Sequence, residues 1–426
     1  MKNFYFIQIT KYCPRKAEKE SFMPEKKKVA IIGNGGRSVS YGEVYAQTPD
    51  VEVVALCDIV PENTLLMAKM SHLENYKSYT RWQDVLVNHP DLDGVCVITP
   101  NHTHREIVMP FIEKGLAVAL EKPITTTMRD TEEILTAAAK YETRMLIGFV
   151  LRSAPFYKKV HEILEEGTIG NPLSIQADEL ASFGVSSCIC RSPWRRYQQS
   201  SGGSMMEKSS HDMDLINWFS SSRPVSVNSY GGNLLFRPNP LFPKYCRNCP
   251  QEKCKYQSKP EFSLAAQDSV LHDFMQHTIA EQNCIYNVEK DIADNQSVQI
   301  EYANGMLANF MLAFNCSGRR AARNLHIVGT KGRIFGNVEE NKLYVHTNED
   351  NRETCWDIKV SGGHSGGNSG HAFELVKMMR DPSYKPDQDA YAGYLSNAIC
   401  IAADISRKEG RRVNFRYDKN DFIEFV

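Results

Sequence analysis

The segment predicted as a helix from about Met205 to Phe219 carries a row of titratable side chains. At helical spacing, Glu207, His211 and Asp214 share one face. Imidazole suits proton transfer near neutral pH, and a carboxylate one turn away can fix its tautomer and stabilise its charged form. The row therefore predicts a general base, His211, with acidic support. A solvated helix face with ordinary surface pairs is the alternative.

A second reactive group follows a short apolar run at residues 117–120, which ends on Glu121, Lys122 and Pro123. Because ligands bind beyond the carboxyl ends of strands in an open parallel sheet, this charged pair is placed to serve a ligand. Pro123 has a fixed φ and no backbone donor, so the strand must stop there. The Lys122 ammonium could hold a substrate hydroxyl and favour its alkoxide-like form while His211 removes the proton. Together the two residues predict oxidation of an alcohol.

The first part of the chain has the residue order of a dinucleotide site. An apolar strand from Lys28 breaks into a turn with Gly33, Gly35 and Gly36, a helix-compatible segment follows, and the next strand closes on Asp58. Gly33 permits the tight turn, and Gly35 lets the backbone approach the pyrophosphate at the helix N-terminus.

The choice of dinucleotide depends on two side chains. Asp58 can accept hydrogen bonds from both ribose hydroxyls and would repel a 2′-phosphate, which favours NAD. Arg37 could attract that phosphate, so NADP stays open. Ser38 stands where the pattern has its third glycine, and a glycine turn in a nucleotide-free α/β domain is the alternative.

Another predicted strand, at residues 94–99, also ends in polar residues. Thr99, Asn101 and His104 follow at the same sheet edge, and Asn101 and His104 could touch the nicotinamide ribose. The alternative is that they cap the helix running from about residue 104 to residue 114. With Glu121, these three residues complete the predicted cofactor site.

The bulk composition is that of an ordinary globular protein. The chain has 426 residues, 42% of them hydrophobic and 24% charged, with a formal net charge of −1. This balance offers no general attraction to nucleic acid or to an acidic membrane, and no apolar run is long enough to cross a bilayer. The apolar stretch at residues 4–9 is too short for a secretory signal. We therefore expect a cytoplasmic protein.

The length predicts more than one core. We expect a loose N-terminal extension at residues 1–25, a dinucleotide-binding domain at 26–148, and a substrate-binding and oligomerisation domain at 149–426. The first domain should be an α/β Rossmann fold with a doubly wound parallel sheet. The second should be α+β with a large, mainly antiparallel sheet, because β-branched and aromatic residues alternate with turn signals. Its predicted strands are 225–236, 297–303, 306–315, 324–329, 333–338 and 342–347.

Three cysteines interrupt this sheet region. Cys246, Cys249 and Cys254 have a spacing that suggests tetrahedral zinc, and Cys284 could be the fourth ligand. Such a metal would be a structural clip away from the chemistry. Free thiols or a disulfide are the alternative, and residues 188 and 190 are the other possible cysteine donors.

These motifs together resemble the Gfo/Idh/MocA family of NAD(P)-dependent oxidoreductases, which act mainly on sugars, inositols and related polyols. The resemblance covers the chain from about residue 28 to the end and is carried by Gly33-Asn-Gly-Gly-Arg, Asp58, Thr99-Pro-Asn-His-Thr-His, Glu121-Lys-Pro and the helix around His211.

One position departs from the family's usual pattern, in which an Asp stands four residues before the His and another acid three residues after it. Glu207 replaces the first acid, His211 and Asp214 match, and Lys208 is an added charge. The substitution leaves open whether Glu207 or Lys208 reaches the substrate.

The resemblance implies hydride transfer between NAD(P) and a hydroxyl carbon of a sugar, inositol or polyol. Cleavage of a glycoside with tightly bound NAD, or nucleotide sensing without turnover, are the alternatives. It also implies an open-faced second sheet that joins subunits into a homodimer or homotetramer. The predicted substrate-binding residues are Lys122, Arg152, Trp194, Lys208 and His364, the last in a glycine-rich loop that could equally be a flexible connection.

Overall fold

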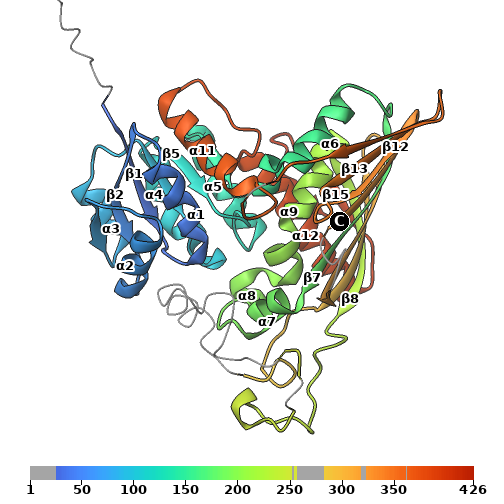
Figure 1. Cartoon of the computed structure of the whole chain (residues 1–426), viewed down its shortest axis with the longest axis horizontal. Helices are drawn as coiled ribbons and strands as arrows, with labels where there is room; N and C mark the ends of the chain where they lie inside the picture. The colour runs from blue at the N-terminus through green and yellow to red at the C-terminus, as the bar shows by residue number, and fades with distance from the viewer. Residues whose placement is uncertain (1–24, 252–253, 257–282, 318–322, 361) are drawn as a thin grey trace, which may run out of the picture.

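A computed structural model of the chain describes residues 25–251, 254–256, 283–317, 323–360 and 362–426. Residues 1–24 of the predicted extension lie outside the described residues. The described chain forms two sheets, each with its own helices, that lie side by side (Figure 1). None of the described helices is both long and apolar enough to span a membrane.

The first sheet is parallel and has six strands in the order β3-β2-β1-β4-β5-β6. Every residue of β4 and β5 is buried, as expected for parallel strands covered on both faces. The order reverses between β1 and β4, which creates the crevice where a dinucleotide binds in such folds. The predicted Rossmann sheet is confirmed. Its strands are β1 (Lys27–Ile32), β2 (Val51–Cys57), β3 (Lys77–Tyr79), β4 (Gly94–Val97), β5 (Ala117–Leu120) and β6 (Met145–Ile147).

Six of the described helices pack on the two faces of this sheet. They are α1 (Gly36–Ala46), α2 (Pro61–Met70), α3 (Trp82–Asn88), α4 (His104–Glu113), α5 (Met128–Lys140) and α11 (Gly367–Arg380). Helix α11 comes from the far end of the sequence, yet Leu375 and Val376 are fully buried in the same apolar cluster as Val29 and Ile31 of β1. The core of the first sheet is therefore completed by a segment that lies within the predicted second domain.

The second sheet has ten strands in the order β14-β13-β12-β11-β7-β10-β9-β8-β15-β16. Only the β7–β10 pair is parallel among the described pairings, so the predicted mainly antiparallel sheet is confirmed. Its strands are β7 (Pro172–Ser182), β8 (Pro224–Gly232), β9 (Asn295–Tyr302), β10 (Leu307–Cys316), β11 (Asn324–Gly329), β12 (Gly332–Asn337), β13 (Lys342–Thr347), β14 (Arg352–Asp357), β15 (Val413–Tyr417) and β16 (Ile423–Phe425).

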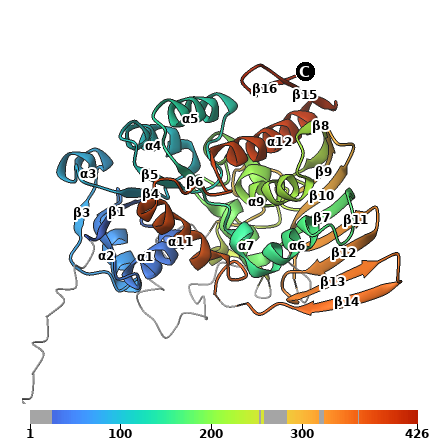
Figure 2. The ribbon, with the colours of Figure 1, turned by 90° about the horizontal axis from the view of Figure 1, so that it is seen from above.

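The helices of this half lie on the side of the sheet that faces the first sheet (Figures 1 and 2). They are α6 (Pro155–Glu165), α7 (Phe183–Arg191), α8 (Gln198–Ser201), α9 (Gly203–Ser220) and α12 (Ala390–Glu409), and short 3-10 turns are η1 (Asn101–Thr103), η2 (Val150–Ser153) and η3 (Cys246–Asn248). Alternate residues of β9 and β10 are buried against these helices, and the others face outward. The sheet is therefore packed on one face and open on the other.

Helix α9 lies between the two sheets and is almost wholly buried. Sixteen of its eighteen residues are buried, and Glu207, His211 and Asp214 are 8%, 5% and 1% exposed. Burial of three titratable side chains on one helix costs free energy unless each finds a partner or a function. The row on α9 is therefore no solvated surface face.

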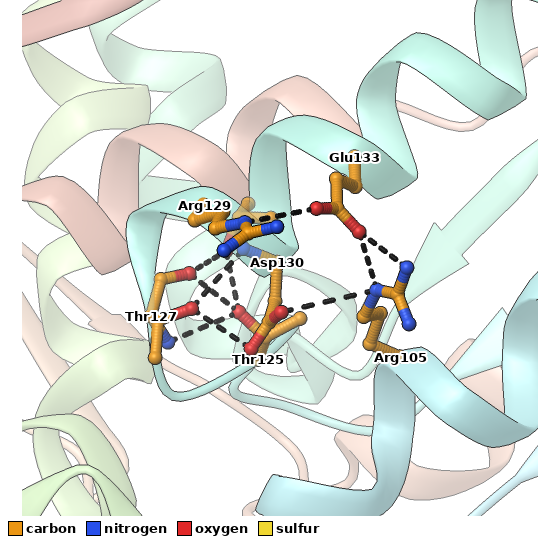
Figure 3. A network of polar contacts seen from close by, with 7 residues as sticks. Arg105, Thr125, Thr127, Arg129, Asp130 and Glu133 are labelled. Carbon is orange, nitrogen blue, oxygen red and sulfur yellow. Dashed lines mark hydrogen bonds and ion pairs between the residues drawn. The ribbon is translucent and has the colours of Figure 1, made fainter.

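The turn that follows Lys122 is anchored by a polar network between α4 and α5 (Figure 3). Thr127 caps α5 by accepting a hydrogen bond from the backbone N–H of Asp130 at 3.1 Å. Arg105 of α4 pairs with Glu133 of α5 at 2.5 Å. These contacts fix the start of α5 and hence the path of the chain as it leaves the carboxyl end of β5.

Hydrogen bonds also tie the second half to the first sheet. Asn397 of α12 donates to the backbone oxygen of Thr125 at 2.9 Å, and the backbone N–H of Ile147 in β6 donates to the backbone oxygen of Gln388 at 2.7 Å. Both bonds lie near the carboxyl ends of β5 and β6. They hold α12, and α9 packed against it, over the edge of the sheet where Lys122 emerges.

Candidate functional site

The glycine turn after β1 has the geometry that a dinucleotide needs. Gly33 has φ +90°, and a Cβ there would lie 2.5 Å from the backbone oxygen of Ile98, so a side chain is excluded by both strain and space. Gly35 precedes α1 with φ −78° and has open space where a Cβ would stand. Gly36 is the first residue of α1, whose N-terminal amides point toward this open space.

Asp58 is held rigidly just beyond β2. Its carboxylate accepts hydrogen bonds from the backbone N–H groups of Asn34 at 2.7 Å and Val60 at 2.9 Å, and from the side chain of Asn63 at 3.2 Å. This places an oriented carboxylate beside the glycine turn, where a ribose would lie. The residues of the turn thus fit NAD.

Arg37 serves a different purpose from the predicted contact with a 2′-phosphate. Its Nε donates to Glu121 Oε1 at 2.6 Å, and its Nη1 donates to Asn368 Oδ1 at 2.7 Å. Tyr41 also donates to Glu121 Oε1, at 3.0 Å. Burial alone would raise the pKa of Glu121, but the Arg37 guanidinium outweighs it and lowers the pKa to about 2. Because the Arg37 guanidinium is bound to Glu121 and Asn368, its charge is not available to the 2′-phosphate of NADP.

Lys122 crosses from the first sheet to α9. Its Nζ donates to the backbone oxygen of Glu207. The Glu207 carboxylate in turn accepts from Arg195 Nε at 2.8 Å and from Asn101 Nδ2 at 2.8 Å. Burial lowers the pKa of Lys122, against the opposing pull of Glu207 and Glu121. The structure therefore brings the predicted lysine and the predicted helix together, and Glu207 is occupied in holding them.

His211 is buried and uncharged. Burial, together with the positive charges of Lys122 and Arg323, lowers its pKa well below 6.5. Its Nδ1 has no hydrogen-bond partner among the described residues. The ring centroids of Phe149 and His364 lie 6.3 and 6.1 Å from that of His211. A neutral imidazole with free lone-pair capacity beside a buried ammonium is suited to accept a proton.

Asp214 does not provide the predicted orientation of His211. Both of its oxygens accept from Arg152, at 2.7 Å from Nε and 2.6 Å from Nη2. This two-bonded pair is buried, and Arg152 also donates to the backbone oxygen of Asp387 at 3.0 Å. Arg152, predicted to bind substrate, instead satisfies the second acid of the row.

The cluster of charges next to His211 was only partly foreseen. Lys208 pairs with Glu179 of β7 at 3.1 Å, so it is engaged with protein rather than held free for a substrate. Arg323 pairs with Glu179 at 2.7 Å and with Asp212 at 2.6 Å. No local signal in the sequence links Arg323 or Glu179 to α9.

Two residues predicted to contact the cofactor form hydrogen bonds within the protein. His104 is fully buried, and its two ring nitrogens lie 2.9 Å from the backbone oxygens of Pro123 and Thr99. This ring therefore joins the turn after β4 to the turn after β5. Asn101 spans the domains by donating to Glu207 and to the backbone oxygen of Ser201 at 2.9 Å.

Of the remaining predicted substrate residues, His364 lies at the site and Trp194 beside it. His364 is exposed and faces the buried His211 ring. Trp194 lies under the guanidinium of Arg195, 4.5 Å from the ring centroid to Cζ. The arginine that reaches Glu207 was missed, although it is the next residue in the sequence.

The predicted zinc site is not supported. Cys246, Cys249, Cys254 and Cys284 do line one cavity of about 290 Å³, but the described residues contain no group of three or more His, Cys, Asp or Glu placed to hold a metal. The Cys246 thiol donates to a backbone oxygen at 3.6 Å, whereas a zinc ligand must be a thiolate. The guanidinium of Arg191, 3.6 Å from the same sulfur, also disfavours a second cation there.

Comparison with protein families decides which group of proteins this chain represents. The model of the oxidoreductase family with an NAD-binding Rossmann fold, Gfo/Idh/MocA, matches residues 27–149, and that of the Gfo/Idh/MocA C-terminal domain matches residues 157–335. The chain belongs to the Gfo/Idh/MocA oxidoreductase family. As a family member it is an NAD-binding oxidoreductase, in keeping with the Gly33 turn and Asp58.

Relatives of known sequence point the same way. A putative oxidoreductase of Bacillus subtilis (strain 168), YteT, is 28% identical over 382 residues, which cover 82% of this chain and 87% of that protein. Inositol 2-dehydrogenase of Rhizobium meliloti (strain 1021) is 24% identical over 205 residues, 48% of this chain and 58% of that protein. The second match thus spans just under half of this chain and a little more than half of that protein.

Solved structures share the whole architecture. Levoglucosan dehydrogenase in complex with NADH and levoglucosan has a TM-score of 0.71 and 20% identity, and the match covers 92% of this chain and 99% of that one. At this identity the likeness shows the fold alone. The two-sheet arrangement of this chain is thus also that of the solved structure.

Substitution by alanine should affect a different property at each of the two glycines of the turn. Gly33→Ala should lower the free energy of unfolding by about 1 kcal/mol or more, because of its positive φ and the contact with Ile98. Gly35→Ala should leave that free energy unchanged but weaken NAD binding, since a methyl would occupy space meant for the pyrophosphate. Urea denaturation and NAD titration measure the two effects. Equal losses of stability in both variants would contradict this assignment.

Proposed function

We propose that the protein oxidises a secondary hydroxyl of a sugar, inositol or related polyol, with NAD as the hydride acceptor. The observation that carries the proposal is the contact of Lys122 with α9, which brings a buried ammonium to the helix of a buried neutral imidazole, His211. The inositol dehydrogenase relative supports the substrate class.

The proposed roles follow from the contacts. Lys122 binds the substrate hydroxyl and stabilises negative charge on its oxygen. His211 accepts the hydroxyl proton as the hydride leaves carbon. Bound NAD supplies the acceptor for that hydride. Glu207 holds Lys122 through its backbone oxygen and is itself fixed by two donors, so it is a positioning residue.

The division of labour between the domains also belongs to the proposal. Residues 26–148 bind the cofactor, and residues 149–426 supply the substrate side, with α11 returning to support the first sheet. His364, facing His211 from its exposed loop, is proposed to contact the sugar. The expected cytoplasmic location stays a prediction.

Redox-assisted cleavage of a glycoside would use the same residues. It is not favoured, because the named relatives above include dehydrogenases and nothing in the described site points to a bond other than C–H and O–H. The two reactions differ in one measurable respect, since only dehydrogenation forms NADH in proportion to product.

We further propose that the open face of the second sheet joins subunits into a homodimer or homotetramer. Tyr230, Leu307, Met311 and Val328 are 70%, 53%, 47% and 37% exposed. Cross-strand register places them on the same outward face of three strands, β11, β10 and β8, which are separated in the sheet by β7 and β9. Exposed apolar side chains gathered on one flat face support an interface between identical subunits.

A panel of sugars and inositols assayed with NAD and NADP tests the proposed activity. We expect NADH formation with at least one polyol, and a Lys122→Ala variant that loses about 10²–10⁴-fold in kcat/KM. Lys114→Ala, an exposed lysine of the same domain, is the matched control and should keep full activity. Unchanged activity in Lys122→Ala would remove the mechanism, and glycoside cleavage without net NADH would favour the alternative reaction.

The pH dependence of the reaction should reveal the lowered pKa of His211. The base must be neutral to accept a proton, and a pKa below 6.5 keeps it neutral at more acidic pH. We therefore expect kcat/KM for oxidation to stay level from pH 8 down to 6.5 and to fall only below that. Lys208→Met removes a neighbouring positive charge and should move the acidic limb upward. A wild-type limb at or above pH 6.5 would speak against His211 as the base.

The oligomeric state can be measured by light scattering on a sizing column. Wild-type protein should run as a dimer or tetramer, and Met311→Arg should shift it toward a smaller species by placing a charge on the apolar face. Val87→Arg, at a 77% exposed position on α3, should leave the mass unchanged. A monomeric wild-type protein would rule out the proposed interface.

A further inference from the structure

The guanidinium of Arg37 connects three parts of the molecule that are far apart in sequence. It belongs to the first turn of α1, directly after the glycine turn. One arm reaches Glu121, the residue before Lys122, and the other reaches Asn368 on α11. The Arg37–Asn368 bond spans 331 residues of sequence. It therefore ties the start of α1 to the first turn of α11, which directly follows the loop that carries His364.

That loop carries His364 and is built to pass close to its neighbours. A Cβ on Gly363 would lie 2.7 Å from Asn368 Nδ2, and one on Gly367 would lie 2.1 Å from the backbone oxygen of Val150. A side chain at Gly367 is therefore excluded by backbone, whereas one at Gly363 would have to displace the Asn368 side chain. Glycine lets the loop lie directly against the Asn368 side chain and against η2.

Within the loop, the backbone folds back on itself around His364. His364 and Ser365 have φ of +50° and +53°, the left-handed region that non-glycine residues adopt only when other contacts enforce it. The backbone N–H of Gly367 donates to the oxygen of His364 at 3.0 Å. Asn368 is the next residue, so the bond from Arg37 acts at the point where the loop meets α11.

We propose that Arg37 and Asn368 form a latch that positions the His364 loop against the nucleotide-binding half, and that both are positioning residues for the substrate. The inference rests on the proposed function in so far as His364 contacts the sugar. Its chemical basis is a charge-assisted hydrogen bond from a guanidinium already fixed by Glu121, whose own place is set by the strand that delivers Lys122. The latch thereby sets His364 relative to Lys122 and His211.

The latch makes a prediction that a cofactor role for Arg37 does not make. If the Nη1 group of Arg37 donates to Asn368, then substitutions at residue 368 should weaken the binding of the substrate and leave the binding of the dinucleotide unchanged. Asn368 supplies only an acceptor oxygen to this bond. An aspartate at the same position keeps that oxygen, whereas an alanine removes it, so the two substitutions separate the bond from the mere size of the side chain.

The experiment compares Asn368→Ala with Asn368→Asp, using Ser369→Ala on the next, exposed residue as the control. In hydrogen–deuterium exchange of the full chain, amides of residues 362–367 should exchange faster in Asn368→Ala than in wild type and return to the wild-type rate in Asn368→Asp. In steady-state assays with the best substrate of the panel, Asn368→Ala should raise KM for the polyol about ten-fold. Asn368→Asp should stay within about two-fold, and the Kd of NAD should not change.

Each outcome is decisive for the latch. It is overturned if Asn368→Ala and Ser369→Ala show the same exchange in residues 362–367, or if Asn368→Asp exchanges as fast as Asn368→Ala. A loss of NAD affinity equal to the loss for the polyol would assign Arg37 and Asn368 to the cofactor instead. The exchange measurement needs no turnover, so it reports on the latch even if no polyol in the panel reduces NAD, the result that would defeat the proposed function.

Discussion

The structure depends on one contact across the boundary between its two halves, the hydrogen bond from the Lys122 ammonium to the backbone oxygen of Glu207. Removing an ammonium from water costs free energy. The hydrogen bond to Glu207 offsets this cost only while the strand β5 and the helix α9 keep their relative positions. Glu207 contributes a backbone oxygen to the lysine and a carboxylate to Arg195 and Asn101, so the same residue anchors both sides. The carboxyl end of β5 and the helix α9 are thereby held together.

The electrostatic design around that contact keeps His211 neutral. Acids that could have charged it are committed elsewhere, Asp214 to Arg152 and Asp212 to Arg323. What remains near the imidazole is burial and positive charge, and both disfavour its protonation. Between residues 207 and 214, α9 thus carries five ionisable side chains, yet only His211 lacks a hydrogen-bond or ion-pair partner among the described residues. That residue is the one suited to take a proton from a substrate.

How much of the fold and of the site can be predicted from the sequence depends on how far apart in the sequence the interacting residues lie. The buried strands, the turn at Gly33 and the lysine at the end of β5 are local consequences of apolar runs, glycine and proline, and these were found. The pairing of the charged side chains could not be predicted, because the partners are far apart in the sequence. Arg152 binds Asp214, which lies 62 positions away. Likewise, α11 completes the core of the first sheet from the far end of the chain. For the cysteines, the local spacing was misleading. It suggested a metal site, but in the fold these residues line one cavity and, among the described residues, form no group placed to hold a metal.

The central claim is that one substrate hydroxyl contacts both the ammonium and the imidazole. A crystal structure of the enzyme with NAD and the best polyol of the panel measures this directly. The account predicts a single sugar oxygen within hydrogen-bond distance of Lys122 Nζ and of a ring nitrogen of His211, with the carbon that bears it facing the nicotinamide. A polyol bound in the cleft with neither group on the same hydroxyl, or with its carbon turned away from the nicotinamide, would contradict it.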